Sequence, residues 1–155
     1  MPEKDFEIWL NDTTRILVSR TTERGALVSF AIILMVLHEG VWTDIGRYDT
    51  AHGIPHQDVL HHRKGLVKKV WMDKLSAREI YAHAIENFRK IIINSSMTTS
   101  RKTLKKVSVP GKTSSVRELD AWILKIGGRA ITPTQKKKIF KEVRWAKIPG
   151  ESVPV

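Results

Sequence analysis

The chain has 155 residues, is 41% hydrophobic and carries a formal net charge of +11. This length and apolar content fit one compact domain with a core and exclude a wholly disordered protein. The sequence contains no cysteine, which excludes disulfides, thiolate catalysis and cysteine-ligated zinc fingers. Because we find no signal peptide and no apolar run long enough to cross a bilayer, we expect a cytoplasmic protein with no membrane partner.

The positive charge is concentrated in the last third of the chain. Residues 1–97 hold 13 Lys or Arg and 12 Asp or Glu, a net charge of +1, whereas residues 98–155 hold 14 and 4, a net charge of +10. A neutral body with a basic extension is typical of proteins that bind an anionic partner, most often nucleic acid. A solubilising tail or a contact with an acidic subunit would give the same composition, so oligomerisation stays open.

Three strands joined by short turns are expected in the first half of the chain, at residues 14–22, 26–37 and 41–49. The first and third alternate apolar with polar residues, while the second is apolar on both faces, as in a central buried strand. Because the connecting loops are short, the three strands form an antiparallel meander. A fourth strand is expected at residues 65–73.

Residues 75–93 change to a helical period. Ser76 and Glu79 give a capping-box signature, and Ile80, Ala84 and Phe88 recur at helical spacing. The pattern of residues 1–97 therefore predicts an α+β body, an antiparallel sheet of about four strands covered by one amphipathic helix.

A basic linker and a basic helical extension follow this body, at residues 98–115 and 116–155. Within the linker, residues 105–109 are a candidate short strand. Two helices are expected in the extension, over residues 116–126 and 133–147, and each begins with a capping signature. The sequence predicts a basic C-terminal helical pair, either as a hairpin or docked on the body.

Seven basic residues of this C-terminal region are candidates for contacts with nucleic acid. Contacts of this kind give salt-sensitive affinity without sequence choice, and RNA is the partner we expect. The seven candidates are Lys105, Lys106, Lys136, Lys137, Lys138, Lys141 and Arg144.

Residues 47–62 read RYDTAHGIPHQDVLHH and hold four of the six histidines of the chain. Metal-independent cleavage of RNA needs a base, an acid and a cation, and histidine suits both proton-transfer roles because its pKa lies near neutrality. The residue types indicate a ribonuclease that needs no cofactor. In this hypothesis His52 and His56 share the acid and base roles, while Asp49 orients an imidazole and Arg47 stabilises the phosphorane.

Two other interpretations of the same stretch stay open. In the first, the protein is a metal-dependent enzyme that holds Zn, Mn or Fe through a mixed oxygen and nitrogen set. The ligands would be Asp49, His52, His56 and His61. In the second, the stretch is a polar turn, and the protein is a non-enzymatic nucleic-acid-binding protein with structural histidines.

The stretch RYDTAHGIPHQDVLHH, after EGVW and before a lone strand and an amphipathic helix, resembles a group of small prokaryotic proteins. They share a Tyr-Asp-Xaa-Xaa-His-Gly core with further histidines downstream, and some are TumE-like toxins of toxin–antitoxin pairs. The likeness covers residues 7–93, although Thr50 replaces an Asn of the group and adjacent His61 and His62 replace a His-Xaa-His. It implies an RNA-directed toxin, a ribonuclease, with a cognate antitoxin as partner. The matched positions are Tyr48, Asp49, His52 and His56.

Overall fold

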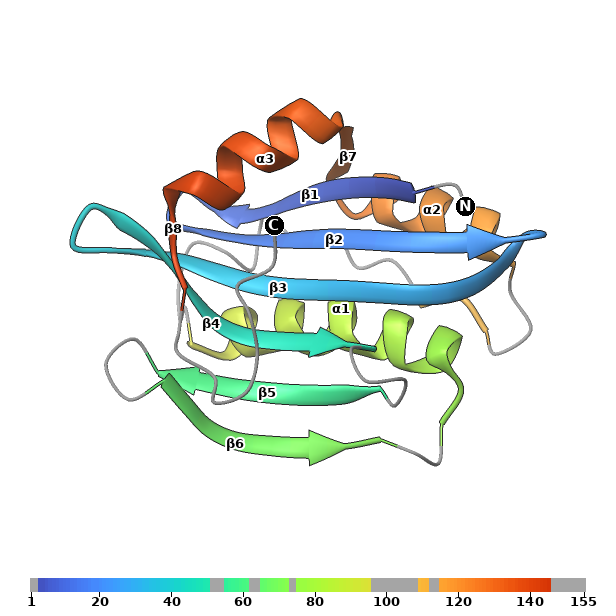
Figure 1. The fold of residues 1–155 in the computed structure, drawn as a ribbon, viewed down its shortest axis with the longest axis horizontal. Coiled ribbons are helices and arrows are strands. Elements are labelled where there is room, and N and C mark those ends of the chain that lie inside the picture. Colours follow the sequence, from blue (N-terminus) through green and yellow to red (C-terminus); the bar gives the residue numbers. More distant parts are fainter. Residues whose placement is uncertain are drawn as a thin grey trace.

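The computed structural model describes residues 3–50, 55–61, 65–72, 75–95, 109–111 and 115–145. Their centre is an eight-stranded sheet, in which seven strands follow the order β6-β5-β4-β3-β2-β1-β7 and β8 pairs with β4 (Figure 1). Every strand pair is antiparallel except β4 with β8. The strands span Glu3–Asn11 (β1), Thr14–Glu23 (β2), Ala26–His38 (β3), Val41–Asp49 (β4), His56–His61 (β5), Gly65–Trp71 (β6), Gly128–Ile131 (β7) and Val143–Arg144 (β8).

The prediction of about four strands covered by one helix is wrong, because the described residues form eight strands and three helices. Strands β2, β3, β4 and β6 lie where strands were expected, whereas β1, β5, β7 and β8 were missed. In β1 and β5, one face of the strand carries charged or histidine residues that turn out to be buried, such as Glu7 in β1 and Asp58 in β5. Sequence patterns assign such residues to solvent, so the strands were not recognised.

The helices cover both faces of the sheet. Helices α1 (Ala77–Ser95) and α2 (Val116–Lys125) pack on one face, and α3 (Pro133–Glu142) packs on the opposite face (Figure 1). The main core lies under α1 and α2 and joins their apolar residues to those of β1, β2 and β3. A smaller core lies under α3 and includes Leu17, Ile33 and Ile139.

The expected helix starts are confirmed by hydrogen bonds at the N-termini. The Ser76 hydroxyl accepts a bond from the Glu79 N–H at 3.2 Å, ahead of α1. Helix α2 has a complete capping box between Ser115 and Glu118, and α3 has one that begins at Thr132. Because these bonds satisfy N–H groups that a helix leaves unpaired, they fix where each helix begins.

The C-terminal helices do not form a hairpin. Strand β7 separates α2 from α3 and pairs with β1, with Asp5 opposite Ile131. Gly128 also lets β7 lie close to α2, because a Cβ there would lie 2.5 Å from the Ile123 side chain of that helix. Helix α3, which was expected to end at residue 147, ends at Glu142, and the chain continues as the short strand β8 beside β4.

The expected linker at 98–115 and its candidate strand at 105–109 lie largely outside the described residues. Residues 109–111 are described, and there the Gly111 carbonyl accepts a hydrogen bond from Arg78 of α1 at 3.2 Å.

Candidate functional site

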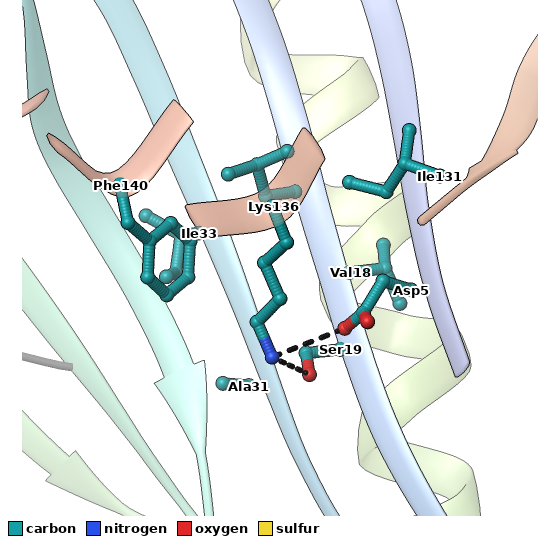
Figure 2. Close-up of a pocket in the computed structure, with 9 residues that line it drawn as sticks. Asp5, Val18, Ser19, Ala31, Ile33, Ile131, Lys136 and Phe140 are labelled. Atoms are coloured by element: carbon teal, nitrogen blue, oxygen red, sulfur yellow. Dashed lines mark hydrogen bonds and ion pairs between the residues drawn. The ribbon is translucent and has the colours of Figure 1, made fainter. Parts of the chain in front are cut away.

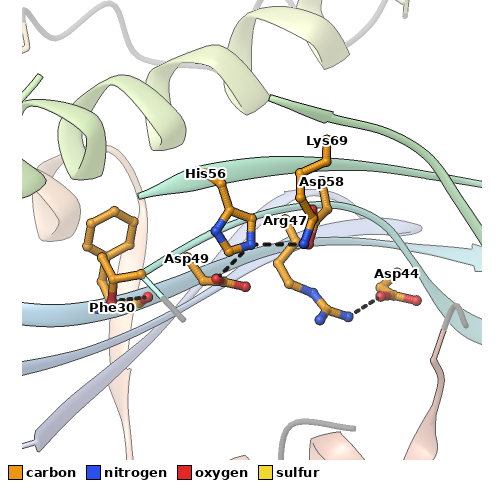
Figure 3. Close-up of polar contacts among 8 residues, drawn as sticks. Phe30, Asp44, Arg47, Asp49, His56, Asp58 and Lys69 are labelled. Atoms are coloured by element: carbon orange, nitrogen blue, oxygen red, sulfur yellow. Dashed lines mark hydrogen bonds and ion pairs between the residues drawn. The ribbon is translucent and has the colours of Figure 1, made fainter. Parts of the chain in front are cut away.

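Strand pairing assembles a polar cluster on the face of the sheet that carries α3. Asp49 at the end of β4 lies directly opposite His56 at the start of β5, and Arg47 lies opposite Asp58. Because side chains alternate along a strand, residues two apart share a face. These four residues therefore gather on one face of two neighbouring strands (Figure 3).

His56 is at the centre of the cluster, between two carboxylates. Its Nε2 atom lies 3.1 Å from Asp49 Oδ1 and 3.5 Å from Asp58 Oδ2. His56 and Asp58 are fully buried, and Asp49 is 7% exposed. One imidazole nitrogen and two carboxylate oxygens thus converge, and these are atom types that can hold a metal ion.

Strand β6 completes one side of the cluster. Lys69 lies opposite Asp58, and its Nζ is 3.7 Å from Asp58 Oδ1, the oxygen that does not approach His56. Trp71 lies opposite His56, with their ring centroids 5.1 Å apart. The Lys69 ammonium also lies 5.3 Å from the Trp71 ring. Lys69 and Trp71 therefore hold Asp58 and His56 in place from the neighbouring strand.

Arg47 belongs to the same face but is directed away from His56. Its Nη2 donates to Asp44 Oδ2 at 2.8 Å, and both side chains are buried. Figure 3 shows the guanidinium turned toward Asp44. On its other side, the guanidinium carbon lies 5.7 Å from the ring of Trp145, which follows β8. The cation expected to stabilise a phosphorane is thus engaged by Asp44.

Tyr48 points to the opposite face of the sheet from Arg47 and Asp49. It is buried in the main core, where its ring packs on Phe88 of α1 at a centroid distance of 5.2 Å. Its hydroxyl accepts a hydrogen bond from Asn87 at 2.8 Å. Burial raises the pKa of Tyr48, and the bond to Asn87 opposes this effect only in part.

Three candidate residues of the sequence analysis lie outside the described residues: His52, Lys105 and Lys106. His61 ends β5 opposite Gly65, and its backbone alone is described. The structure therefore brings together Asp49 and His56 from the expected site. It adds Asp58, Lys69 and Asp44, which were missed as site residues. A correct assignment of β5 would have found Asp58, because it lies two residues after His56.

The basic residues of α3 divide into an inward and an outward set. Lys137, Lys138 and Lys141 are exposed, as is Arg144 in β8. Lys136 instead reaches down to the sheet (Figure 2). Its Nζ lies 2.6 Å from Glu3 Oε1, 2.9 Å from Ser19 Oγ and 3.2 Å from Asp5 Oδ1.

These contacts change the charge equilibria at the base of α3. Partial burial by itself lowers the pKa of Lys136, but the bond to Glu3 and the charge of Asp5 outweigh it and leave the pKa above its ordinary value. The bond from Lys136 likewise lowers the pKa of Glu3. Lys136 is therefore held by acidic neighbours, and the exposed cations are the ones that can meet an anionic partner.

The chain belongs to a family described as domain of unknown function DUF7718, whose model matches residues 1–93. The matched segment contains the whole polar cluster and ends within α1, before α2, β7, α3 and β8. Neither the curated proteins nor the solved structures contain a significant match to the chain. Among the described helices, none has the length and apolar character needed to cross a membrane.

Proposed function

We propose that the protein binds nucleic acid through the exposed cations of α3 and β8, and that this nucleic acid is RNA. We call this set the basic surface and define it as Lys137, Lys138, Lys141 and Arg144. The observation that carries the proposal is that all four are exposed on two consecutive elements. Cations placed in this way contact phosphates and release counterions, which gives affinity without sequence preference.

Lys136, which precedes the basic surface in α3, supports the proposal because its charge is already paired with acidic residues. Among the described residues, the salt bridges of α3 are made by Lys136 alone, with Glu3 and Asp5. The basic surface is therefore available to a partner, while Lys136 fixes the helix on the sheet. We also propose that binding takes place in the cytoplasm, since a cysteine-free chain fits a reducing compartment.

A salt titration of RNA binding tests this proposal. Fluorescence anisotropy with a labelled single-stranded RNA would give the affinity at several salt concentrations. We expect the variant K137A/K138A/K141A/R144A to bind more weakly, and its log–log salt slope to fall by about 0.7 for each phosphate that the protein no longer neutralises. Truncation is unsuitable, because α2 and β7 belong to the core and the sheet.

The matched control removes four exposed cations from other parts of the molecule, in the variant K68A/K90A/R117A/K125A. Its net charge changes by the same amount, so a purely global attraction would weaken binding equally in both variants. Equal losses of affinity in the two variants, or no binding by the natural chain, would contradict the proposal.

A second candidate function is ribonuclease activity at His56, as the resemblance to TumE-like toxins implies. It is favoured by the 3.1 Å approach of Asp49 to the imidazole, which is how a carboxylate orients a histidine base. The chain would then be the toxic member of a pair with a cognate antitoxin. Because His56 is fully buried, the reaction requires a change of structure that exposes the imidazole to RNA.

Incubation of the protein with labelled RNA, with and without EDTA, separates the enzymatic alternatives. Cleavage that survives chelation and disappears in a folded H56Q variant supports a metal-independent ribonuclease. Cleavage that disappears on chelation supports the metal-dependent enzyme. Binding without cleavage leaves the protein as a nucleic-acid-binding protein and removes the ribonuclease hypothesis.

A further inference from the structure

We propose that Asp49, His56 and Asp58 form a site for one divalent transition-metal ion that ties β4 to β5. Asp49 lies across the strand pair from His56, and Asp58 follows two residues later on the same face. One ligand atom from each residue lies within 4.8 Å of the other two. Figure 3 shows the three side chains turned toward one another. This inference goes beyond nucleic-acid binding and does not depend on it.

The two distances from His56 to the carboxylate oxygens match those between neighbouring ligands of a small cation. Zinc and similar ions hold N and O ligands at about 2.0–2.2 Å, which places neighbouring ligand atoms about 2.8–3.6 Å apart in octahedral or tetrahedral geometry. Nε2 of His56 lies 3.1 Å from the Asp49 oxygen and 3.5 Å from the Asp58 oxygen. Both distances fall within that interval.

The two contacts differ in whether their length would suit a hydrogen bond. Nε2 carries at most one proton, and N–H···O bonds extend to about 3.2 Å between heavy atoms. The 3.1 Å contact with Asp49 lies within this range, whereas the 3.5 Å contact with Asp58 lies beyond it. A metal ion shared by the three ligand atoms explains both contacts at once.

The ligand set selects the class of ion. One imidazole with two carboxylates suits Zn²⁺, Mn²⁺ or Fe²⁺, whereas Ca²⁺ and Mg²⁺ prefer all-oxygen sites. Lys69 contacts the second oxygen of Asp58 and so orients the first toward His56. His56 and Asp58 are fully buried, so an ion held there joins β4 to β5 inside the protein.

Metal binding is measured directly on the full chain after treatment with EDTA and removal of the chelator. Isothermal titration with Zn²⁺ and with Mn²⁺ gives stoichiometry and affinity, and Co²⁺ gives a visible absorption spectrum that reports coordination. We expect one ion per chain and no binding of Ca²⁺. At a free concentration about 100 times Kd, we expect Zn²⁺ or Mn²⁺ to raise the Tm by about 5–10 °C.

Variants locate the ligands. H56Q and D58N are expected to weaken binding by at least about 100-fold, since changes to mere outer neighbours already cost up to that amount. D49N alters the least buried of the three ligands, and it is also expected to weaken metal binding. If H56Q or D58N fails to fold by circular dichroism, the Tm rise of the natural chain and the affinity of D49N decide the matter.

Two controls exclude other ligands. D44N removes a buried carboxylate of the same face that bonds to Arg47, and it should keep the affinity of the natural chain. H52A/H61A removes histidines that sequence proximity alone would suggest, and it should also keep that affinity. Absence of binding by the natural chain would overturn the proposal. So would binding that disappears in H52A/H61A or is unchanged in D49N. No nucleic acid is present in these measurements, so their failure leaves the proposed RNA binding standing.

Discussion

Helices pack on both faces of the sheet, but the two faces are built from different chemistry. The face under α1 and α2 is mostly apolar, with side chains such as Ile8 and Ile32 in one core, and it also holds the ion pair of Arg20 with Asp120. The face under α3 mixes a small apolar core with buried charges, among them Arg15, Arg47 and Asp58. Apolar burial is non-directional, whereas buried charges need specific partners. One face therefore depends mainly on apolar burial, and the other depends more on specific contacts between buried charges.

The largest loss of stability is expected for Phe88→Ala, in the core between the sheet and α1. The ring is 2% exposed and packs on Tyr48 and against Gly46, where a Cβ would lie 3.0 Å from it. Loss of a buried ring leaves a cavity, so we expect the free energy of unfolding to fall by about 3–5 kcal/mol in urea denaturation. Ile91→Ala on the same helix is the control, since Ile91 is 45% exposed, and a comparable loss there would contradict the contrast.

The second largest loss of stability is expected for Arg15→Met, on the face of the sheet that carries α3. The guanidinium lies 4.2 Å from the Trp42 ring and 5.1 Å from the Trp9 ring, and its Nη1 is 3.4 Å from Glu7 Oε2. Glu7 is 2% exposed, so its carboxylate loses a buried partner, and we expect the free energy of unfolding to fall by about 2 kcal/mol in thermal or urea unfolding.

Arg129→Met is the matched control for Arg15→Met. Arg129 also contacts Glu7, at 2.9 Å, but its side chain is 66% exposed. Exposed ion pairs contribute little, so we expect a loss of about 0.5 kcal/mol. A larger loss for Arg129→Met than for Arg15→Met would show that burial does not set the strength of these contacts.

Tyr48→Phe sharpens the comparison within a single strand, because Tyr48 and Asp49 point to opposite faces. The substitution removes the hydroxyl that accepts the bond from Asn87, and we expect a loss of about 1 kcal/mol in the free energy of unfolding. RNA binding and metal affinity should remain those of the natural chain. If a folded Tyr48→Phe variant differed from the natural chain in RNA binding or metal affinity, Tyr48 would have to be counted among the functional residues.

The smallest effect is a pH dependence of stability from Glu3 and Lys136. The folded pKa of Glu3 lies below its ordinary value of 4.5, so its contribution is present above pH 4.5 and is lost as pH falls through the folded pKa. Glu3 is half exposed, so we expect about 0.5 kcal/mol. In Lys136→Met, unfolding curves at pH 7 and in mild acid should differ less than in the natural chain. An unchanged difference would mean that another pair is responsible.

The sequence predicted elements whose signal is local. Ser76, Ser115 and Thr132 begin their helices as expected, because a capping box depends on residues three positions apart. Long-range packing was not predictable in the same way. That Lys136 turns inward, for example, depends on Glu3 and Asp5, more than 130 positions away along the chain.

The site was predicted in part for the same reason. Asp49 and His56 were found because they belong to a stretch rich in histidine. Asp58 was overlooked, because a strand whose alternate residues are His and Asp does not resemble a strand with a buried face. Its partner Lys69 is on a further strand, and only the register of β5 with β6 brings the two together.

The pairing of β1 with β7 has a consequence for the order in which the protein is made. Asp5 can pair with Ile131 only after Ile131 has been synthesised, about 6–25 s later at ordinary elongation rates. Until then the first strand has one side without a neighbour, and open strand edges invite association with other nascent chains. Slow completion of the sheet is therefore expected, with the N-terminal edge in need of protection during synthesis.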